Sequence, residues 1–443
     1  MLRDLIFVHF ILAFLLFGIL GCDDSPTDAN DDLDLEDVIE INTIEELQKI
    51  GNEDEFPADW DYELGSDIDA SATAEWNDGA GFEPISENFT GTLQGNNYEI
   101  QDLTINRPGH EGNVAIFERV QGDNAEISNL SITGVNISAD DVEGVGALAG
   151  VLWDGEFRNI HVEGNIMGNR DVGLIAGWNE TEVSDLSSEG EIQLNEGEEI
   201  PSAAGGIFGG NGGNISNSHA HVDITSDSDN ATNLGGLIGW NSQSGVIEES
   251  YATGSVSNGE RNLGGLVGWN NGIVYASFAT GDVSGNSRVG GLIGDSFVQS
   301  ETVVIPKISE SYATGDVTGT GDAEYIGGLI GSSAIQEDHE VDGIHNVYAT
   351  GTVTGDPETT GGLIGSNGGI TDVHPAYEFS TGYWNTETTE QESDVGVGLS
   401  GENARGLNTE QMQGDAAGEN MSDLDFEDTW QTVSGDYPAL WWQ

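Results

Sequence analysis

The sequence predicts an all-β solenoid, a stack of about eight glycine-rich coils, and three observations support this fold class. A five-residue unit, Gly-x-(Leu/Ile)-x-Gly, occurs eight times at intervals of 26 to 37 residues. Glycine accounts for 65 of the 443 residues, as expected for a chain with many turns. The repeats lack the 3.6-residue periodicity of amphipathic helices, which argues against a helical solenoid. The units begin at Gly146, Gly173, Gly205, Gly235, Gly264, Gly290, Gly327 and Gly361.

A second unit, aromatic-Ala-Thr-Gly, follows the first in the later repeats, as in Tyr251-Ala252-Thr253-Gly254. A repeat of roughly 30 residues cannot bury its apolar side alone, so neighbouring coils must stack. We therefore expect Leu237 to lie near Leu266 and Leu292 in a continuous core. Further copies of the second unit begin at Phe278, Tyr312, Tyr348 and, with serine in place of alanine, Phe379.

These residues resemble a known repeat. Gly-Gly-Leu-Ile-Gly-Trp-Asn at 235–241, paired with Ser-Tyr-Ala-Thr-Gly at 250–254, is similar to the GLUG repeat of bacterial surface proteins. The resemblance implies a right-handed parallel β-helix with N- and C-terminal caps. Such repeats occur in adhesin-like proteins and in some secreted IgA-type metallopeptidases, so the resemblance does not identify a ligand. Similar flanking segments at 64–69, 89–96, 382–385, 406–412 and 437–440 extend it to roughly residues 41–443.

The N-terminus resembles the signal peptide of a bacterial lipoprotein. Arg3 is followed by the apolar run from Leu5 to Leu20, which is shorter than the ~20 residues of a membrane-spanning helix. Ile19-Leu20-Gly21-Cys22 resembles a lipobox, which implies that Cys22 is lipidated and anchors the protein in the cell envelope, at the outer membrane or cell surface. The alternative is an ordinary signal peptide with an incidental cysteine.

We divide the chain into five segments by composition. Within the third segment, Thr43 and Glu46 form the pattern of a helix capping box. The segments are a signal peptide at 1–21, an acidic tether at 22–40, an N-terminal cap with the first irregular coils at 41–143, the GLUG-repeat β-helix at 144–368 and a closing segment at 369–443.

The charge of the chain restricts its partners. Asp and Glu total 79 against 10 Lys and Arg, a formal net charge of -69. Nucleic acid and anionic membrane surfaces are repelled by such a chain, so we expect no nucleic-acid partner and membrane contact through the lipid alone. We interpret the acidity as a general surface property of halophilic type. Scattered calcium sites between coils are the alternative, and no cofactor is predicted.

The sequence contains no recognisable catalytic motif. His-Glu-x-x-His, the zinc-binding motif of metallopeptidases, is absent, and His110-Glu111 and His339-Glu340 lack the second histidine at the required spacing. We therefore predict a non-catalytic, adhesin-like surface protein whose β-helix is used for adhesion or for binding a glycan or a protein, without catalytic or metal-binding residues. A polysaccharide lyase or hydrolase and a structural spacer are the alternatives. Acidic and basic residues grouped in a groove would favour an enzyme.

Two aligned columns contain the candidate functional residues. We interpret the first column as a structural ladder whose side-chain amides hydrogen-bond between coils at a turn, with ligand binding as the alternative. Trp240 and Trp269 precede two of its members, and exposed indoles can stack on sugar rings. The second column is aromatic and is predicted to face outward as a binding strip for a glycan or a surface protein; the alternative is that a loop covers it. The first column is Asn179, Asn211, Asn241, Asn270 and Asn367, and the second is Tyr251, Phe278, Tyr312 and Tyr348, ending at Phe379.

Overall fold

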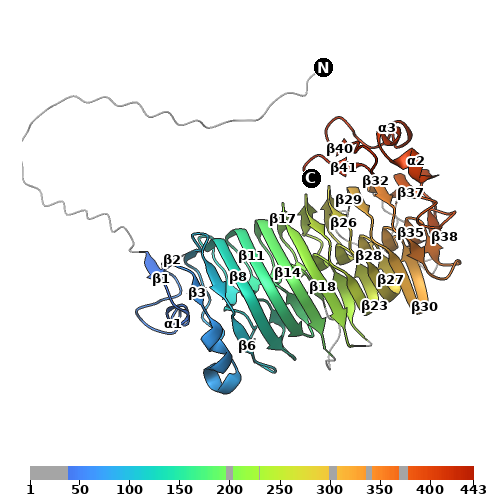
Figure 1. Cartoon of the computed structure of the whole chain (residues 1–443). Coiled ribbons are helices and arrows are strands. Elements are labelled where there is room, and N and C mark those ends of the chain that lie inside the picture. Colours follow the sequence, from blue (N-terminus) through green and yellow to red (C-terminus); the bar gives the residue numbers. More distant parts are fainter. Residues whose placement is uncertain (1–37, 196–202, 229, 299–306, 336–341, 369–377) are drawn as a thin grey trace, which may run out of the picture. The chain divides into compact units, whose positions relative to one another are not determined.

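Each sequence repeat forms one coil of short strands separated by turns (Figure 1). The computed structural model describes residues 38–195, 203–228, 230–298, 307–335, 342–368 and 378–443. One coil runs from β16 (Phe208–Asn211) through β17 (Asn214–Ser216), β18 (His219–Ser226) and β19 (Thr232–Gly235) to β20 (Ile238–Asn241). The next coil starts there, because β20 pairs in parallel with β16.

Equivalent strands of successive coils form two long parallel sheets, so the predicted parallel β-helix is confirmed. One sheet has ten strands, and eight of them, all but the first and the last, follow a Gly-x-(Leu/Ile) turn. These are β7 (Phe117–Val120), β10 (Ala149–Leu152), β13 (Ala176–Asn179), β16, β20, β24 (Val267–Asn270), β28 (Ile293–Val298), β31 (Ile330–Ile335), β35 (Ile364–Asn367) and β38 (Val395–Gly398).

The second sheet has 29 strands and contains the other faces of the coils. Its long early strands are β8 (Glu126–Ala139), β11 (Glu156–Gly168) and β14 (Glu182–Leu194). Later coils divide this path into shorter strands. These include β21 (Val246–Glu248), β22 (Tyr251–Ala252), β23 (Val256–Gly264), β25 (Ile273–Tyr275), β26 (Phe278–Ala279), β27 (Val283–Gly290), β29 (Lys307–Ala313), β30 (Val317–Gly327), β32 (Asp342–Ala349), β33 (Val353–Thr354), β34 (Thr360–Gly361) and β36 (Glu378–Phe379).

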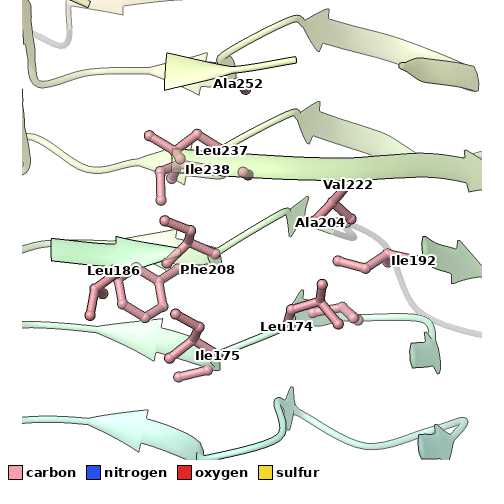
Figure 2. Close-up of a cluster of buried hydrophobic side chains, with 14 of the residues drawn as sticks. Leu174, Ile175, Leu186, Ile192, Ala204, Phe208, Val222, Leu237, Ile238 and Ala252 are labelled. Atoms are coloured by element: carbon pink, nitrogen blue, oxygen red, sulfur yellow. The ribbon is translucent and has the colours of Figure 1, made fainter. Parts of the chain in front are cut away.

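Leucines of the Gly-x-Leu turn form the spine of the core. The amide of Leu237 donates to the carbonyl of Leu266 at 2.9 Å, and Leu266 donates to Leu292 at the same distance. All three side chains are fully buried in one cluster that runs along the coils. Figure 2 shows part of this cluster, in which Ile175, Phe208 and Leu237 of successive coils lie one above another. The predicted leucine stacking is therefore confirmed.

Glycine is required where the second unit turns into the next strand. A Cβ at Gly281 would lie 1.9 Å from the carbonyl oxygen of Gly254, and one at Gly315 would lie 2.0 Å from that of Gly281. The backbones of successive coils therefore touch at this column, and only glycine fits.

The N-terminal coils join the repeats without a break in the sheet. Thr43 caps α1 (Ile44–Leu47) with the reciprocal Glu46 bond, as the capping-box pattern predicts. Beyond the expected boundary at residue 144, β11 pairs along its length with β8. Other elements here are β1 (Ile39–Ile41), β2 (Asp61–Leu64), β3 (Ile68–Asp69), the 3₁₀ segment Ser71–Gly79, β4 (Thr92–Gln94), β5 (Glu99–Gln101), β6 (Thr104–Asn106), β9 (Gly144–Val145), β12 (Asp171–Gly173) and β15 (Ala204–Gly205).

The chain closes with two further strands and a segment that leaves the coil path. The strands are β37 (Thr381–Asn385) and β39 (Asn403–Leu407), which pair in parallel. The segment after them contains α2 (Thr409–Met412), α3 (Asp415–Asn420) and the antiparallel pair β40 (Trp430–Gln431) and β41 (Ala439–Leu440). We call residues 408–443 the C-terminal cover, and Figure 1 shows it beside the later coils.

Candidate functional site

The asparagine column forms a hydrogen-bonded ladder at the last residues of strands in the ten-stranded sheet, where the next turn begins. Nδ2 of Asn179 donates to Oδ1 of Asn211 at 2.8 Å, Asn211 donates to Asn241 at 2.9 Å, and Asn241 donates to Asn270 at 2.8 Å. All four side chains are fully buried, which makes them inaccessible to a ligand. Asn367 lies apart from this run, where Oγ of Ser333 donates to its Oδ1 at 3.0 Å.

The tryptophans that precede these asparagines stack on one another. The ring centroids of Trp240 and Trp269 lie 5.4 Å apart at an interplanar angle of 15°, and Trp178 meets Trp240 nearly edge-on at 5.3 Å. Trp178 fills the space above Gly210, where a Cβ would lie 2.0 Å from its ring. Trp240 thus contacts an indole on each side. A sugar platform needs an open ring face, so the stacking geometry does not favour Trp240 as one.

The second column is a stack of aromatic rings on the outside of the 29-stranded sheet. Successive centroids from Tyr251 through Phe278 and Tyr312 to Tyr348 are 4.8, 4.9 and 4.7 Å apart, with interplanar angles of 2°, 3° and 6°. Ala252 and its equivalents point into the core, so the aromatic rings point away from it as the alternation predicts.

The C-terminal cover hides this column, and the prediction of a solvent-facing strip is therefore wrong for three of its members. Phe278, Tyr312 and Tyr348 are 7%, 6% and 1% exposed, and Tyr251 alone is half-buried. Trp442 lies 5.7 Å from Phe278 and Trp430 lies 5.6 Å from Tyr348, measured between ring centroids. The predicted alternative, aromatics covered by a separate segment, describes the structure.

The end of the column also differs from the prediction. Tyr383, rather than Phe379, pairs with Tyr348 in the next coil. Phe379 pairs with Ile344 and is buried in the main core. The reason is a register shift between β32 and the strands that follow it, which an alignment of sequence motifs does not show.

Hydrogen bonds fasten the cover to the column. The hydroxyl of Tyr348 donates to the carbonyl of Pro438 at 2.6 Å, and the side chain of Gln443 donates to the hydroxyl of Tyr312 at 2.7 Å. Nε1 of Trp442 donates to the carbonyl of Ala276 at 3.0 Å. Burial raises the pKa of both tyrosines well above the ordinary value of 10, which keeps the hydroxyls protonated.

A cavity of about 660 Å³ opens between the cover and the coils. Threonines of the second unit line one wall, Thr314 and Thr350 among them, and Tyr437 of the cover lines the other. Asp316 and Asp436 add carboxylates. The volume is in the range of ligand sites, and the lining combines aromatic rings with hydroxyls and acceptors. We call this space the cover cavity.

A second cavity of about 570 Å³ lies in the N-terminal coils. Its lining includes Glu118 and Arg119 of β7, His110 and Glu111 from the preceding loop, and Arg170. Acidic and basic groups therefore meet in one hollow. We call this space the N-terminal cavity, and the sequence did not predict it, because its residues come from five separate segments.

Sequence analysis also missed a serine ladder beside the aromatic column. The amide of Ser218 donates to Oγ of Ser250, Ser250 donates to Ser277, and Ser277 donates to Ser311, at 3.1 to 3.2 Å. These serines are fully or almost fully buried and fix the position of each ring in its coil. The signal was present in the sequence, since a serine directly precedes Tyr251, Phe278 and Tyr312.

Three further features bear on the predicted sites. Cys22, the predicted lipidation site, lies outside the described residues. Across residues 38–443, apart from the segments left undescribed, no three His, Cys, Asp or Glu side chains are grouped to hold a metal ion. Within the same described part, each helix is too short or too polar to cross a bilayer.

Two protein-family models match parts of this chain. The GLUG motif matches residues 230–257, and the N-terminal region of the M26 IgA1-specific metallo-endopeptidases matches residues 58–164. The resemblance predicted from the repeats is therefore confirmed. The chain contains the GLUG motif and folds as a parallel β-helix.

Curated relatives are similar over part of their length. Halomucin from Haloquadratum walsbyi is 33% identical over 289 residues, which are 64% of this chain and 3% of halomucin. An immunoglobulin A1 protease from Streptococcus pneumoniae is 31% identical over 184 residues, 39% of this chain and 9% of the protease. The zinc metalloprotease ZmpC of that species is 30% identical over 244 residues, 53% of this chain and 11% of ZmpC. This chain thus spans 3 to 11% of these relatives.

One solved structure matches over most of both chains. It is a putative immunoglobulin A1 protease from Bacteroides ovatus, with 13% sequence identity, a TM-score of 0.42, and coverage of 92% of this chain and 93% of that one.

Proposed function

We propose that this chain is a non-catalytic binding module of the cell surface, tethered by a lipid on Cys22. The GLUG repeats and the similarity to halomucin support an extracellular location. The lipobox-like sequence that ends at Cys22 supports the anchor. The acidic residues that precede the β-helix, 23–37, would then separate it from the membrane, because like charges keep a segment extended.

The cover cavity carries this proposal. Successive threonines of the second unit stand one coil apart, at about the 4.8 Å spacing of paired strands. Their hydroxyls, with the carboxylates of Asp316 and Asp436 and the ring of Tyr437, present donors, acceptors and an apolar surface in one hollow. This combination suits a short glycan or an extended peptide.

A glycan-array screen of residues 38–443, in high salt with and without calcium, tests the proposal. That fragment forms one compact unit. We expect binding that Thr350→Val weakens at least tenfold, because the substitution keeps the shape and removes a hydroxyl from the cavity. Thr253→Val is the matched control, since it changes the same motif position in a coil beyond the cavity. Equal binding by both variants would contradict a role for the cover cavity.

A polysaccharide-active enzyme is the second candidate function. The N-terminal cavity groups Glu118, Glu111 and Arg170, the arrangement that would favour an enzyme. Each glycan that binds is therefore incubated with the protein and analysed for shorter products. If the protein cleaves a glycan and Glu118→Gln abolishes the cleavage, the protein is an enzyme and the proposal of a non-catalytic binding module is wrong.

The anchor is tested separately by Cys22→Ser. We expect the variant to move from the membrane fraction to the soluble fraction of the cells that make it, because the acyl chains attach to the thiol. Unchanged membrane association would contradict lipidation at this residue.

A further inference from the structure

The N-terminal cavity differs chemically from the cover cavity, because pairs of opposite charge surround it. Glu118 and Arg119 of β7 lie at its wall, and the loop of residues 109–113 borders it. Nη1 of Arg170 lies 3.7 Å from Oε1 of Glu143, another lining residue. The chain has only 10 Lys and Arg residues in all. Two arginines that line the same cavity are therefore unusual in this protein.

The carboxylate of Glu118 is held in a fixed position. Nε2 of His110 lies 3.0 Å from its Oε1. A Cβ at Gly112 would lie 2.3 Å from its Oε2, so glycine lets the loop close over the carboxylate. Asn113 donates to the carbonyl of Glu118 at 2.9 Å and ties the loop to the strand. An acceptor held in this way loses little freedom when a ligand binds.

Arg119 has no polar partner for its side chain. In the part of the chain that the structure describes, its guanidinium makes no hydrogen bond and no ion pair, although Asp and Glu outnumber Lys and Arg by 79 to 10. The guanidinium lies over the ring of Trp153, 5.5 Å from the ring centroid. A guanidinium carries five N–H donors, and here they are available to a ligand at the cavity.

Trp153 supplies an aromatic surface at the edge of the cavity: it is not a lining residue, but its ring contacts Arg119, which is one. It follows β10 in the adjacent coil and is 47% exposed. The contact with Arg119 holds the ring in place. An exposed indole beside fixed donors and acceptors is suited to a sugar, whose C–H groups pack on the ring while its hydroxyls hydrogen-bond at the edges.

We propose that the N-terminal cavity binds a neutral sugar unit of a glycan chain. The Trp153 ring stacks on the sugar, Arg119 donates to its hydroxyls and Glu118 accepts from them. Charge disfavours an anionic ligand. Four lining carboxylates, those of Glu111, Glu118, Asp141 and Glu143, face two arginines, so the hollow repels an anionic sugar.

The inference rests on the proposed binding function, and its test separates the two. Residues 38–443 are titrated with neutral hexose oligosaccharides, with uronic-acid oligosaccharides and chitosan oligomers as charged probes. We expect the neutral probes to bind, and we expect Trp153→Ala and Arg119→Gln each to weaken that binding at least tenfold. Trp441→Ala is the matched control, because Trp441 is 55% exposed and lies in the C-terminal cover.

The outcomes distinguish the proposed binding function from the proposed sugar site in the N-terminal cavity. Loss of neutral-glycan binding in the Trp153 and Arg119 variants but not in Thr350→Val places the site in the N-terminal cavity. Loss in Thr350→Val alone overturns this inference and leaves the proposed function intact. Stronger binding of a charged probe overturns the assignment of a neutral ligand. Absence of binding to every glycan overturns this inference, while a peptide bound in the cover cavity would still support the proposed function. Circular dichroism of each variant confirms that the β-helix is folded.

Discussion

Buried side-chain amides and hydroxyls fix the register between coils. The asparagine ladder and the serine ladder each join a side chain to its equivalent in the next coil. A register slip of one residue would leave these buried groups without partners, at a cost of about 1–3 kcal/mol for each group. The ladders therefore select one alignment among many similar glycine-rich strands.

Replacing Asn241 tests this selection. Asn241→Ala removes two amide–amide bonds inside a buried turn, and we expect the free energy of unfolding to fall by about 2–4 kcal/mol. Chemical denaturation at constant salt measures the change. Asn286→Ala is the control, because Asn286 joins Glu260 of the previous coil by a single exposed bond and should cost less than about 1 kcal/mol. Similar losses in both variants would contradict the ladder's role.

Asp171 introduces a pH dependence. Burial raises its pKa from 3.8 to about 6; nearby Arg170 opposes the shift and Glu143 adds to it. The folded chain therefore holds this proton more tightly than the unfolded chain. The associated stability is complete below about pH 4 and is lost as the pH rises through 6.

We expect Asp171→Asn to stabilise the protein at pH 7.5 by an amount on the order of 2 kcal/mol, because the amide carries no charge to desolvate. The gain should shrink towards zero at pH 4. Thermal unfolding of both proteins across this range gives the measurement, and a gain independent of pH would show that the carboxylate is not its source.

Among the elements, the C-terminal cover has the largest effect on which surfaces reach solvent. It converts a stack of four aromatic rings from an exposed strip into a second, smaller core that includes Trp430 and Leu440. That core is separate from the one inside the coils. Without the cover, the rings would form an exposed apolar patch of the kind that promotes association.

Two adjacent tryptophans allow a matched test of the cover. Trp442 packs on Phe278 and donates a hydrogen bond to the backbone, whereas Trp441 is 55% exposed. We expect Trp442→Ala to loosen the cover by about 2–3 kcal/mol, with faster amide hydrogen exchange in residues 430–443 and self-association at high concentration. Trp441→Ala should leave exchange unchanged. Equal protection of these amides from exchange in both variants would mean that contacts other than those of Trp442 hold the cover.

At the scale of the whole molecule, the net charge affects the stability of the folded state. A formal net charge of -69 on a chain with 10 basic residues produces strong self-repulsion in the folded state. Few ion pairs offset this repulsion. In the described ranges, most of the ion pairs join an arginine to one or two carboxylates. Screening by salt must therefore contribute to stability.

We expect the melting temperature to rise steadily as sodium chloride increases from 0.1 M to 2 M. The screening length falls from about 10 Å at 0.1 M to about 3 Å at 1 M, which removes repulsion between neighbouring carboxylates. Sodium chloride is preferred to sulfate in this test, because sulfate also strengthens apolar burial. A melting temperature that does not change with salt would contradict a halophilic surface.

The structural features that recur in every coil could be predicted from the sequence, whereas those that depend on contacts between unrelated segments could not. Repetition identified the parallel β-helix, the stacking of Leu237 on Leu266 and the outward direction of Tyr312. The covering of Tyr312 was not predictable, because it depends on Gln443, 131 positions away, and no periodic pattern relates the two. The N-terminal cavity was missed for the same reason, since Arg119 and Arg170 line one cavity only because the coils stack.

The cover also sets an order of events in folding. Trp442 and Ala276 are joined across 166 positions, whereas the coils form through contacts between neighbouring repeats. During synthesis from the N-terminus, the coils bearing Tyr251, Phe278 and Tyr312 emerge well before the residues that shield them. The nascent chain therefore passes through an interval with a bare aromatic stack. A chaperone that recognises such a surface would bind before residues 408–443 emerge and be displaced when they dock.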